Sequence, residues 1–451
     1  MAKDKLTDYD ATASNNTDVG GVSVAEGMLP SGVNNAIREQ MSHLADFAAG
    51  TSGVDVLKLQ DDTDTNSIKL QAPASVTATT TFTLPDGDGT ADQVLKTDGS
   101  GQLGFADRHP NPSLIINGGM TVSQRGTSQT GVTVGAYLNA PDRYIFQPNS
   151  AGTWSVSQST TTPAGFANSY KVECTTADAS LASGDYVLFE QRLEGQDLQN
   201  LKKGTSSAES VTVSFWVRSA KTGTYIVEID DNDNTRNINK SYTISSADTW
   251  EHKTITFEGD TTGALDNDNN FSLRVIFWLA AGSDFSSGTL ATTWQPTTNA
   301  NRVVGQVNLA DTVGNDWYIT GVKLEVGDTA TPFVHRSFGE ELALCQRYCW
   351  VKSSSSTNAD FGVGVTGGTS AIIVVPHFYE MRTAPTITFS AASTFIVVDG
   401  VGGMTATSMT AGTTTAFSST ITPGYSGGTG GRSGVLRRAS GTATITADAE
   451  L

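Results

Sequence analysis

Short stretches in which every second residue is apolar recur along this 451-residue chain, and they limit what it can fold into. VTVSFWVRS and FSLRVIFWL show the alternation most clearly, with apolar residues at Val211, Val213, Phe215 and Val217 and at Phe271, Leu273, Val275, Phe277 and Leu279. Because successive side chains of a strand point to opposite faces, each stretch would present one apolar face. Two sheets that close on such faces form a β-sandwich, which we predict for residues 109–338.

The composition also favours strands over helices. Charged residues make up only 16% of the chain, whereas it contains 46 glycines and many Ser, Thr and Asn residues. Such a balance suits many short strands and turns. The length allows about three domains of roughly 150 residues each. We therefore predict a mainly β, multi-domain chain.

The charge balance excludes some classes of partner. Lys and Arg number 28 and Asp and Glu number 46, so the formal net charge is −18 and the chain as a whole would repel a nucleic-acid backbone. No run of about eighteen apolar residues is present, and the start MAKDKLTDYD lacks the apolar stretch of a secretion signal. We expect no nucleic-acid partner, no membrane insertion, and a soluble chain that is not exported by the signal-peptide route.

Residues 1–50 predict one helix after an irregular polar segment. Apolar residues recur there at spacings of four and three, at Val33, Ile37, Met41, Leu44 and Ala48. Ser31 is the expected N-cap of the helix and Gly50 its expected end. A stripe this narrow has no core of its own to face, so we interpret it as packing against the same helix in sister chains. Packing onto the irregular segment before the helix is the alternative.

Residues 51–108 contain short alternating stretches, VDVLKLQ, SIKLQAP and TTFTLP, followed by DGDGTADQVLKTDGSGQLGF. Aspartate-glycine pairs favour turns, because glycine adopts positive φ freely and aspartate caps its own backbone. Strands so short bury too little surface to fold alone. We therefore predict a short β stalk that is intertwined with neighbouring chains.

The run LEVGDTATPFVHRSFGEELALCQRYC, residues 324–349, combines a histidine, arginines, glutamates and two cysteines. Ser337 followed by Glu340 matches the capping box S-x-x-E, so a helix is expected to begin there, in a connector at residues 339–356. Its apolar stripe consists of Phe338, Leu342, Cys345 and Cys349. We interpret the run as a connector that follows the last sandwich strand, Trp317–Val326, and fixes the distal domain near the axis of an assembly.

The three cysteines, Cys174, Cys345 and Cys349, are too few to cross-link so long a chain, and we expect reduced thiols. A disulfide between residues four apart in a helix is disfavoured, because the two Cβ vectors run parallel. A metal at Cys345 and Cys349 would need ligands from several chains, since His335 precedes the helix cap. The cysteines are therefore expected to pack as small apolar residues.

Residues 357–451 carry little charge and are rich in Thr, Ser, Gly and Ala. AIIVVPHF, TITFS, FIVVDG and TATITA are candidate strands, and the spacing of the turns between them predicts a second, smaller β domain. Because it comes last, we expect this domain to be the exposed tip.

Motifs that are similar to reactive centres lack the context that such centres need. GYSGG at residues 424–428 matches the nucleophile elbow G-x-S-x-G, but the triad histidine should follow Ser426, and the last histidine is His377. Two aspartate-rich segments, DDNDNT from Asp230 and DNDNN from Asp266, have oxygen-bearing side chains at alternate positions, as a calcium-binding loop does. They lack the Gly at position six and the Glu at position twelve of such a loop. We expect turns there, with no catalytic residue, no metal and no cofactor. A calcium ion and a pair of glycan-cleaving carboxylates are the open alternatives.

Two sets of aromatic and basic residues are candidates for receptor binding. The first alternates with the apolar positions of the sandwich strands and comprises Trp216, Arg218, Arg274 and Trp278. If their strands are neighbours, these residues would form a stacking platform for sugars, and a subunit interface is the alternative. The second set, near the far end, comprises Arg432, Arg437 and Arg438. It would meet an anionic glycan, or else it is a solvated loop cluster.

Several segments resemble phage proteins. LPDGDGTADQVLKTDGSGQLGF resembles the strand-and-turn unit that recurs in bacteriophage tail fibres, and DYDATASNNTDVGG with EGMLPSGVNNAIREQMSHLA resembles the amino-terminal segment of virion fibre proteins of marine phages. Between residues 111 and 349, NPSLIINGGMTVSQRGTS, APDRYIF, VTVSFWVRS, SADTWEHKTITFEGD and DWYITGVKLEVGDTATPFVHRSFGEELALCQRYC resemble, in order, the carbohydrate-binding-module-like jelly roll of phage tail proteins. VPHFYEMRTAPTITFS is similar to the start of the distal domain that follows it.

The resemblance implies an elongated, homotrimeric virion fibre that is attached to the tail through residues 1–50 and is made in the cytoplasm of the bacterial host. Its partners would be further copies of itself, tail or adaptor proteins, and host cell-surface polysaccharide. Three weak sites on one fibre would act by avidity. The alternatives are a tailspike that cuts polysaccharide and a fibre or decoration of the capsid, since the anchoring segment indicates only that the chain docks.

Overall fold

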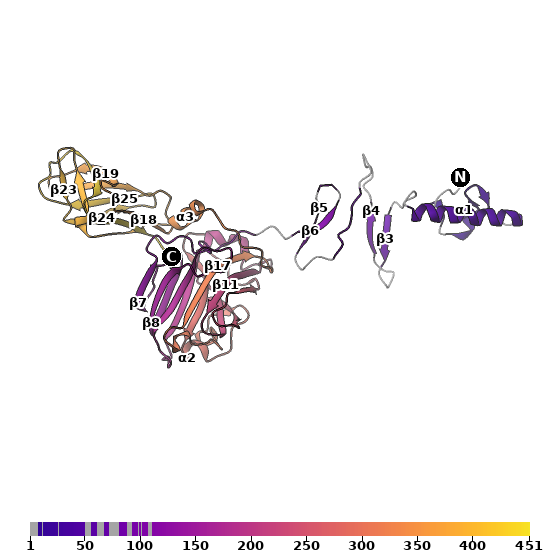
Figure 1. The fold of residues 1–451 in the computed structure, drawn as a ribbon, viewed down its shortest axis with the longest axis horizontal. Coiled ribbons are helices and arrows are strands. Elements are labelled where there is room, and N and C mark those ends of the chain that lie inside the picture. The colour runs from indigo at the N-terminus through magenta and orange to yellow at the C-terminus, as the bar shows by residue number, and fades with distance from the viewer. Residues whose placement is uncertain are drawn as a thin grey trace. The chain divides into compact units, whose positions relative to one another are not determined.

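A computed structural model describes residues 8–10, 12–25, 27–49, 56–60, 67–71, 81–87, 93–97, 99–100, 102–106 and 111–451. The chain divides into two compact units, Met1–Ala106 and Asp107–Leu451, and most of its elements are strands (Figure 1). The predicted mainly β class is confirmed. Within the described ranges, no helix is both long and apolar enough to cross a lipid bilayer.

In the described part of unit 1, a long helix follows a 3-10 turn and a small hairpin. These elements are η2 (Ala13–Asn15), β1 (Asp18–Val19), β2 (Val22–Ser23) and α1 (Pro30–Ala48). Helix α1 begins with Pro30, and Leu29 is its N-cap, without a side-chain hydrogen bond. Ser31 is therefore the second helical residue, and its predicted role as N-cap is wrong. Proline suits the first position because the N–H that it lacks would have no partner there. Gly50, predicted to end the helix, lies outside the described residues.

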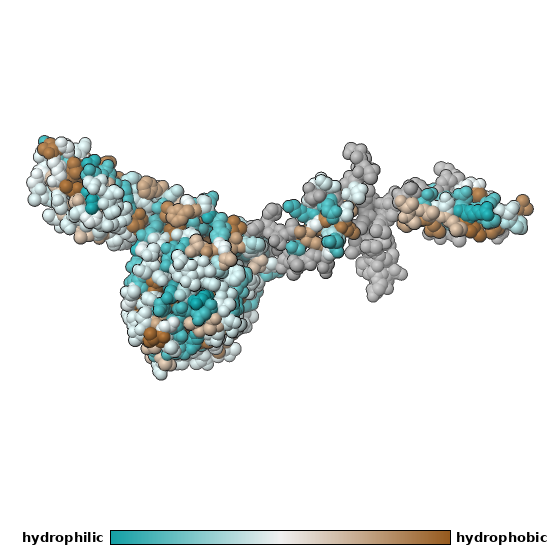
Figure 2. Space-filling model, in the orientation of Figure 1, coloured by the Kyte–Doolittle hydropathy of each residue, from teal (hydrophilic) through white to brown (hydrophobic). Residues whose placement is uncertain are grey.

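The apolar stripe of α1 is exposed, and Figure 2 shows apolar residues gathered along this helix. The exposed fractions are 44% for Val33, 50% for Ile37, 64% for Met41 and 55% for Leu44. The buried residues of α1 are Ala36 and His43, and the Tyr9 hydroxyl lies 2.8 Å from Nδ1 of His43. The preceding segment thus packs against a neighbouring face of α1 and leaves the stripe uncovered. Pairing of the stripe with sister chains stays a prediction.

Two short antiparallel hairpins complete the described part of unit 1. They are formed by β3 (Val56–Gln60) with β4 (Ser67–Gln71), and by β5 (Val94–Thr97) with β6 (Leu103–Ala106). Each hairpin is a separate two-stranded sheet. Two-stranded sheets bury little surface on their own, so the predicted association of the stalk with neighbouring chains stays a physical expectation.

The sandwich of unit 2 is one continuous sheet whose strand order is β14-β11-β17-β9-β8-β10-β15-β12-β13-β16, with β7 paired to β8. Its strands are β7 (Ser128–Val134), β8 (Ile145–Ser159), β9 (Ser169–Thr176), β10 (Tyr186–Glu194), β11 (Val211–Ser219), β12 (Gly223–Asp231), β13 (Arg236–Ile244), β14 (Glu251–Phe257), β15 (Phe271–Ala281), β16 (Gln295–Pro296) and β17 (Asp316–Val326). Short helical segments lie between them, namely η3 (Gly195–Leu201), α2 (Ser283–Ser286), η4 (Asn299–Asn301) and η5 (Leu309–Asp311).

Strand β8 joins the two layers of the sandwich. Its first residues, 145–149, pair with β10, and its last, 153–159, pair with β9. The apolar faces of the layers meet inside, where the ring centroids of Phe215 on β11 and Phe277 on β15 are 5.0 Å apart. Both phenylalanines are buried, as the alternation predicted. The predicted inward faces of β11 and β15 are therefore confirmed, except that Phe271 is only half-buried.

The C-terminal part of unit 2 is a second β domain with its own core. Its elements are α3 (Phe338–Gln346), β18 (Cys349–Ser354), β19 (Asp360–Thr366), β20 (Ala371–Pro376), β21 (Thr386–Phe389), η6 (Ala392–Thr394), β22 (Phe395–Val398), β23 (Gly403–Thr405), β24 (Ser408–Thr414), β25 (Ser418–Gly424), β26 (Ser433–Arg438) and β27 (Ala443–Asp448). They form sheets of order β18-β27-β21 and β23-β22-β26-β19-β20-β25-β24. Trp350, Phe361 and Phe395 are buried between them.

The capping box at the start of α3 is formed as predicted. Glu340 donates its backbone N–H to Oγ of Ser337 at 3.3 Å, and Ser337 donates its own to Oε2 of Glu340 at 2.9 Å. The predicted stripe is only partly correct, because α3 ends at Gln346, Cys349 opens β18, and Phe338 is 62% exposed. Leu342, the remaining member of the stripe, is half-buried.

Cys345 and Cys349 are both fully buried and unbonded to each other. Burial raises the pKa of the Cys349 thiol to about 12 and that of Cys345 well above its usual range. Both thiols are therefore protonated at neutral pH, in keeping with their predicted packing role. Within the described ranges, no three His, Cys, Asp or Glu side chains are grouped so that they could hold a metal ion.

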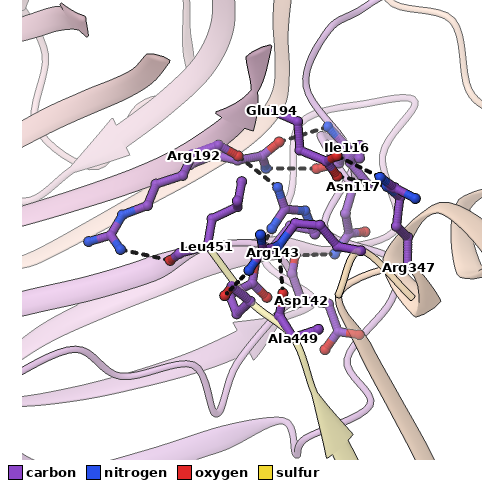
Figure 3. A network of polar contacts seen from close by, with 12 residues as sticks. Ile116, Asn117, Asp142, Arg143, Arg192, Glu194, Arg347, Ala449 and Leu451 are labelled. Atoms are coloured by element: carbon purple, nitrogen blue, oxygen red, sulfur yellow. Dashed lines mark hydrogen bonds and ion pairs between the residues drawn. The ribbon is translucent and has the colours of Figure 1, made fainter. Parts of the chain in front are cut away.

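A polar network joins the connector and the end of the chain to the sandwich (Figure 3). Arg143 is fully buried, and its guanidinium lies 3.3 Å from the ring centroid of Tyr348. It also forms an ion pair with Glu450 and donates a hydrogen bond to the carbonyl oxygen of Arg192 at 2.7 Å. Arg192 in turn donates to the carbonyl oxygen of Leu451 at 2.7 Å. The sandwich and the C-terminal domain thus share buried polar contacts.

Candidate functional site: an aromatic groove on the sandwich

The four residues of the predicted sugar platform lie on two opposite outer faces. Trp216 and Arg218 belong to β11, whereas Arg274 and Trp278 belong to β15. Because the inward faces of β11 and β15 meet across the core, their outward faces point away from each other. The prediction that these residues form one platform is therefore wrong.

Trp278 is not available to stack on a receptor. Its exposed fraction is 1%, and its indole N–H donates to Oε2 of Glu228 at 2.7 Å. Phe285 of α2 lies 5.6 Å away between ring centroids, and the guanidinium of Arg302 lies 5.1 Å from the indole. Residues 282–308 thus cover this outer face.

The two arginines of the predicted platform are paired with carboxylates of the sandwich. Arg274 contacts Glu190 at 3.0 Å and Asp230 at 2.8 Å. Burial lowers the pKa of Arg274, but the two carboxylates outweigh it and raise the pKa above its usual range. Arg218 pairs with Asp248 at 2.7 Å. Each guanidinium is therefore already neutralised by at least one carboxylate of the sandwich.

Glu228 is a carboxylate whose pKa is shifted in the direction that a glycan-cleaving acid requires. Burial raises its pKa and Asp230 adds to the effect, while Arg302 opposes it. However, Glu228 is fully buried and accepts hydrogen bonds from Arg302 at 2.9 Å and from Trp278. A substrate would reach it only if residues 282–308 moved.

The three arginines near the far end do not form a cluster. Arg437 and Arg438 are consecutive residues of β26, so their side chains leave on opposite faces. Arg437 pairs with Asp360 at 2.6 Å, and Arg438 donates to the carbonyl oxygen of Gly441 at 2.7 Å. Arg432 precedes the strand and is half-buried. Arg437 and Arg438 therefore do not share one face, and binding of an anionic glycan by these three residues stays a prediction.

The two aspartate-rich segments form turns that are held by their own contacts. Asp231 forms an ion pair with Lys203 and accepts from the backbone N–H of Asn234 at 3.1 Å. Asp233 accepts from the backbone N–H of Asp266 at 2.9 Å, which ties one segment to the other. These carboxylates thus stabilise the turns in which they lie.

Trp216 lies in a groove on the outer face of β11, β14 and β17, and this groove is the candidate functional site. We call it the Trp216 groove. Its volume is about 480 Å³, and its lining includes five aromatic rings, from Trp216, His252, Phe166, Phe333 and His335. Ser214, Gly321, Ala330, Thr331 and Pro332 complete the lining.

The five rings are in contact with one another in two groups. The centroids of Trp216 and His252 are 5.1 Å apart. Phe166 lies 5.2 Å from Phe333 and 4.9 Å from His335, which is also 4.9 Å from Phe333. Such spacings are typical of aromatic pairs and leave ring faces and edges open toward the groove.

A β-bulge at Gly321 brings the two groups together. Ser214 pairs with Lys323 and Trp216 with Thr320, so β17 has one residue more than β11 at this point. Gly321 has φ +62°, and a Cβ atom there would lie 2.6 Å from the ring of Phe166 and 3.2 Å from that of Trp216. Only glycine allows both the backbone conformation and the approach of the two rings.

A buried ion pair holds the segment that carries Phe333 and His335. We call this segment, residues 327–336, the strap. Lys323 and Glu325 on β17 are 3.0 Å apart and are fully covered beneath it. Thr331 of the strap donates its N–H and its hydroxyl to Glu325, at 2.8 and 2.6 Å, and its hydroxyl oxygen accepts from Lys323 at 2.5 Å. The ion pair therefore positions one wall of the groove.

Among the residues that line the Trp216 groove, all of them described, none is Asp, Glu, Lys or Arg. Burial lowers the pKa of His252, so its ring is neutral at neutral pH. Aromatic faces with neutral donors and acceptors beside them suit a ligand that has apolar C–H faces and hydroxyl edges.

Sequence reasoning identified only Trp216 of this site. The other four rings come from the loop before β9, from β14 and from the strap, far apart in the chain. His252 alternates with buried positions of its strand, which is a usable signal. Phe166, Phe333 and His335 lie outside the strands, where alternation gives no information.

No protein-family model matches the chain, and no curated protein matches its sequence. Among solved structures, the enzymatically active domain of tailspike protein 4 from bacteriophage CBA120 is 10% identical over 48% of this chain and 21% of that chain, with a TM-score of 0.26. The family 11 carbohydrate-binding module from Clostridium thermocellum, in complex with a mixed-linked tetrasaccharide, is 12% identical over 46% of this chain and 99% of that chain, with a TM-score of 0.24. At these identities and TM-scores, nothing about function follows from the likeness.

Proposed function

We propose that this chain is a structural fibre protein of a virion, and that it attaches the particle to its host by binding cell-surface polysaccharide in the Trp216 groove. The observation that carries the proposal is the groove itself, in which five aromatic rings surround a hollow of about 480 Å³ whose lining contains no Asp, Glu, Lys or Arg. Aromatic rings stack on the C–H faces of sugars, and such stacking requires no covalent step. The proposed role is therefore binding without catalysis.

The segments that resemble phage tail and virion fibres support the fibre part of the proposal. The exposed apolar stripe of α1 supports association of several copies, because a surface helix normally buries its apolar face. In the proposed assembly, a homotrimer docks on the tail or an adaptor through residues 1–50. Three weak sites on each fibre then raise the effective concentration without any tight single contact.

The test is adsorption of virions whose fibre carries Trp216→Ala. Adsorption to host cells should fall by about tenfold or more, since one lost stacking contact is worth roughly 1–3 kcal/mol and is repeated in every copy. Trp250→Ala is the matched control, because Trp250 packs 6.2 Å from Tyr318 outside the groove. Equal adsorption of both variants and the parent would refute the proposal.

Two further observations separate the alternatives. Purified full-length protein spotted on a lawn of host cells should leave it unchanged, whereas a spreading halo would identify a glycan-cleaving tailspike. Labelled antibodies against the chain should decorate the tails of intact particles. Labels on the capsid would indicate a head fibre instead.

A further inference from the structure

We infer that the Trp216 groove selects uncharged glycans, by stacking neutral pyranose rings on its aromatic walls, and that it rejects glycans that carry carboxylate or phosphate groups. This inference rests on the proposed function, because it names the class of sugar that the same site takes. It replaces the prediction that arginines of the sandwich would read anionic polysaccharide.

The lining supplies no cation for an acidic sugar. Of the ten residues that line the groove, none is Asp, Glu, Lys or Arg, and two are histidines, His252 and His335. An acidic sugar would have to bring its negative charge into a partly desolvated groove without a counter-charge. The cost of such an unpaired, partly buried ion exceeds what one stacking contact contributes.

Cations on the strands that carry the groove are already paired with carboxylates. Lys253 follows His252 but lies opposite Phe215, so it points to the other face of β14, and it pairs with Glu251 at 2.5 Å. Lys323, beneath the strap, is fully buried against Glu325. Arg218, two residues after Trp216, pairs with Asp248. An acidic glycan would therefore compete with a carboxylate that already neutralises each of these cations.

The charge of the whole chain acts in the same direction. The formal net charge is −18, so a polyanionic polysaccharide approaches against a repulsive field at low ionic strength. A neutral polysaccharide meets no such field. Its hydroxyl groups also match neutral donors and acceptors of the groove, namely the ring of His252 and the backbone of the strap.

The experiment measures binding of the full-length protein to pairs of soluble polysaccharides, in which both members of a pair have the same backbone and only one is acidic. The pairs are hydroxyethyl cellulose with carboxymethyl cellulose, and dextran with dextran sulfate. An array of neutral and uronic-acid-containing oligosaccharides is measured as well. Binding is expected for neutral probes only. It should change by less than about twofold between about 50 mM and about 0.5 M salt, because stacking is not screened. It should be lost in Trp216→Ala and kept in Trp250→Ala.

A gain-of-function variant sharpens the test. His335 is exposed, so His335→Arg places an unpaired cation at the rim without disturbing the core. This variant should bind the acidic probes, with affinity that falls about tenfold or more as salt rises over the same range.

The possible failures are distinguishable. If the parent protein binds the acidic probes in a salt-dependent manner and Trp216→Ala abolishes that binding, the groove is the site but the inferred sugar class is wrong. If no probe is bound, or if binding survives Trp216→Ala, the proposed function fails, and this inference fails with it.

Discussion

Arg347, directly after α3, donates two hydrogen bonds to the carboxylate of Glu194 at the end of β10, from Nε at 2.7 Å and from Nη2 at 2.6 Å (Figure 3). Glu194 is fully buried, whereas Arg347 is about a quarter exposed. The pair therefore fixes the connector to the sandwich through a fully desolvated carboxylate. This contact gives physical content to the predicted role of residues 324–349 as a connector.

Arg347→Ala should destabilise unit 2 by roughly 3 kcal/mol, because it leaves a buried carboxylate without its partner. Arg437→Ala is the control, since its partner Asp360 is exposed and such pairs contribute less than about 1 kcal/mol. Urea unfolding of both full-length variants measures the difference. Equal losses would show that the Glu194 pair contributes no more than a surface ion pair.

Thr331→Val should weaken glycan binding by about fivefold or more, because it removes the hydroxyl that joins the strap to the buried Lys323–Glu325 pair. Thr331→Ser keeps that hydroxyl and should bind within about twofold of the parent. Affinity is measured by titration with the best neutral probe. If both variants bind equally well, the ion pair does not position the strap.

Gly321→Ala should lower both stability and glycan affinity, because its Cβ would meet the rings of Phe166 and Trp216. Gly314→Ala is matched in backbone conformation, with φ +89° against +62°, but nothing lies within 4 Å of the added Cβ. The control should therefore lose only about 1–2 kcal/mol of stability and keep its affinity. Thermal unfolding and probe titration together separate the two effects; loss of affinity in the control would contradict the role of the bulge.

Stability should fall as pH is lowered from 7 to 5, and His252 should account for part of the fall. Burial places the folded-state pKa of His252 below its unfolded value of about 6.5, so the unfolded chain binds the proton first. The stability that the neutral ring contributes is present above pH 6.5 and is lost as pH falls through and below that value. The free energy of unfolding of His252→Gln should differ less between pH 7 and pH 5 than that of the parent. An equal difference in both proteins would show that His252 does not contribute to the pH dependence.

Met41→Glu should reduce the association state of the full-length protein, because it places a charge in the exposed stripe of α1. Ser42→Glu is the control: Ser42 is exposed and lies on the side of the helix away from the stripe. Sedimentation velocity of the parent should show a homotrimer, and Met41→Glu a smaller species. A parent that sediments as a folded single chain would refute association through this stripe.

Local patterns in the sequence predicted the local structure well. The alternation around Phe215 and Phe277 correctly assigned inward faces, since strand geometry alone fixes which side chains share a face. The capping box of Ser337 and Glu340 correctly placed the start of α3, because its hydrogen bonds span only three residues. The cap at Ser31 was predicted wrongly, since Pro30 offered a competing start one residue earlier.

The sequence by itself therefore determined the fold class, the inward faces of the strands, and Trp216 as an outward aromatic residue. Only the tertiary structure decided that Trp216 and Trp278 face opposite ways, that residues 282–308 cover one of them, and that Phe166, Phe333 and His335 join the other. The physical reason is that strand periodicity depends on neighbouring residues, whereas strand pairing and loop placement depend on contacts between residues that are far apart in the chain.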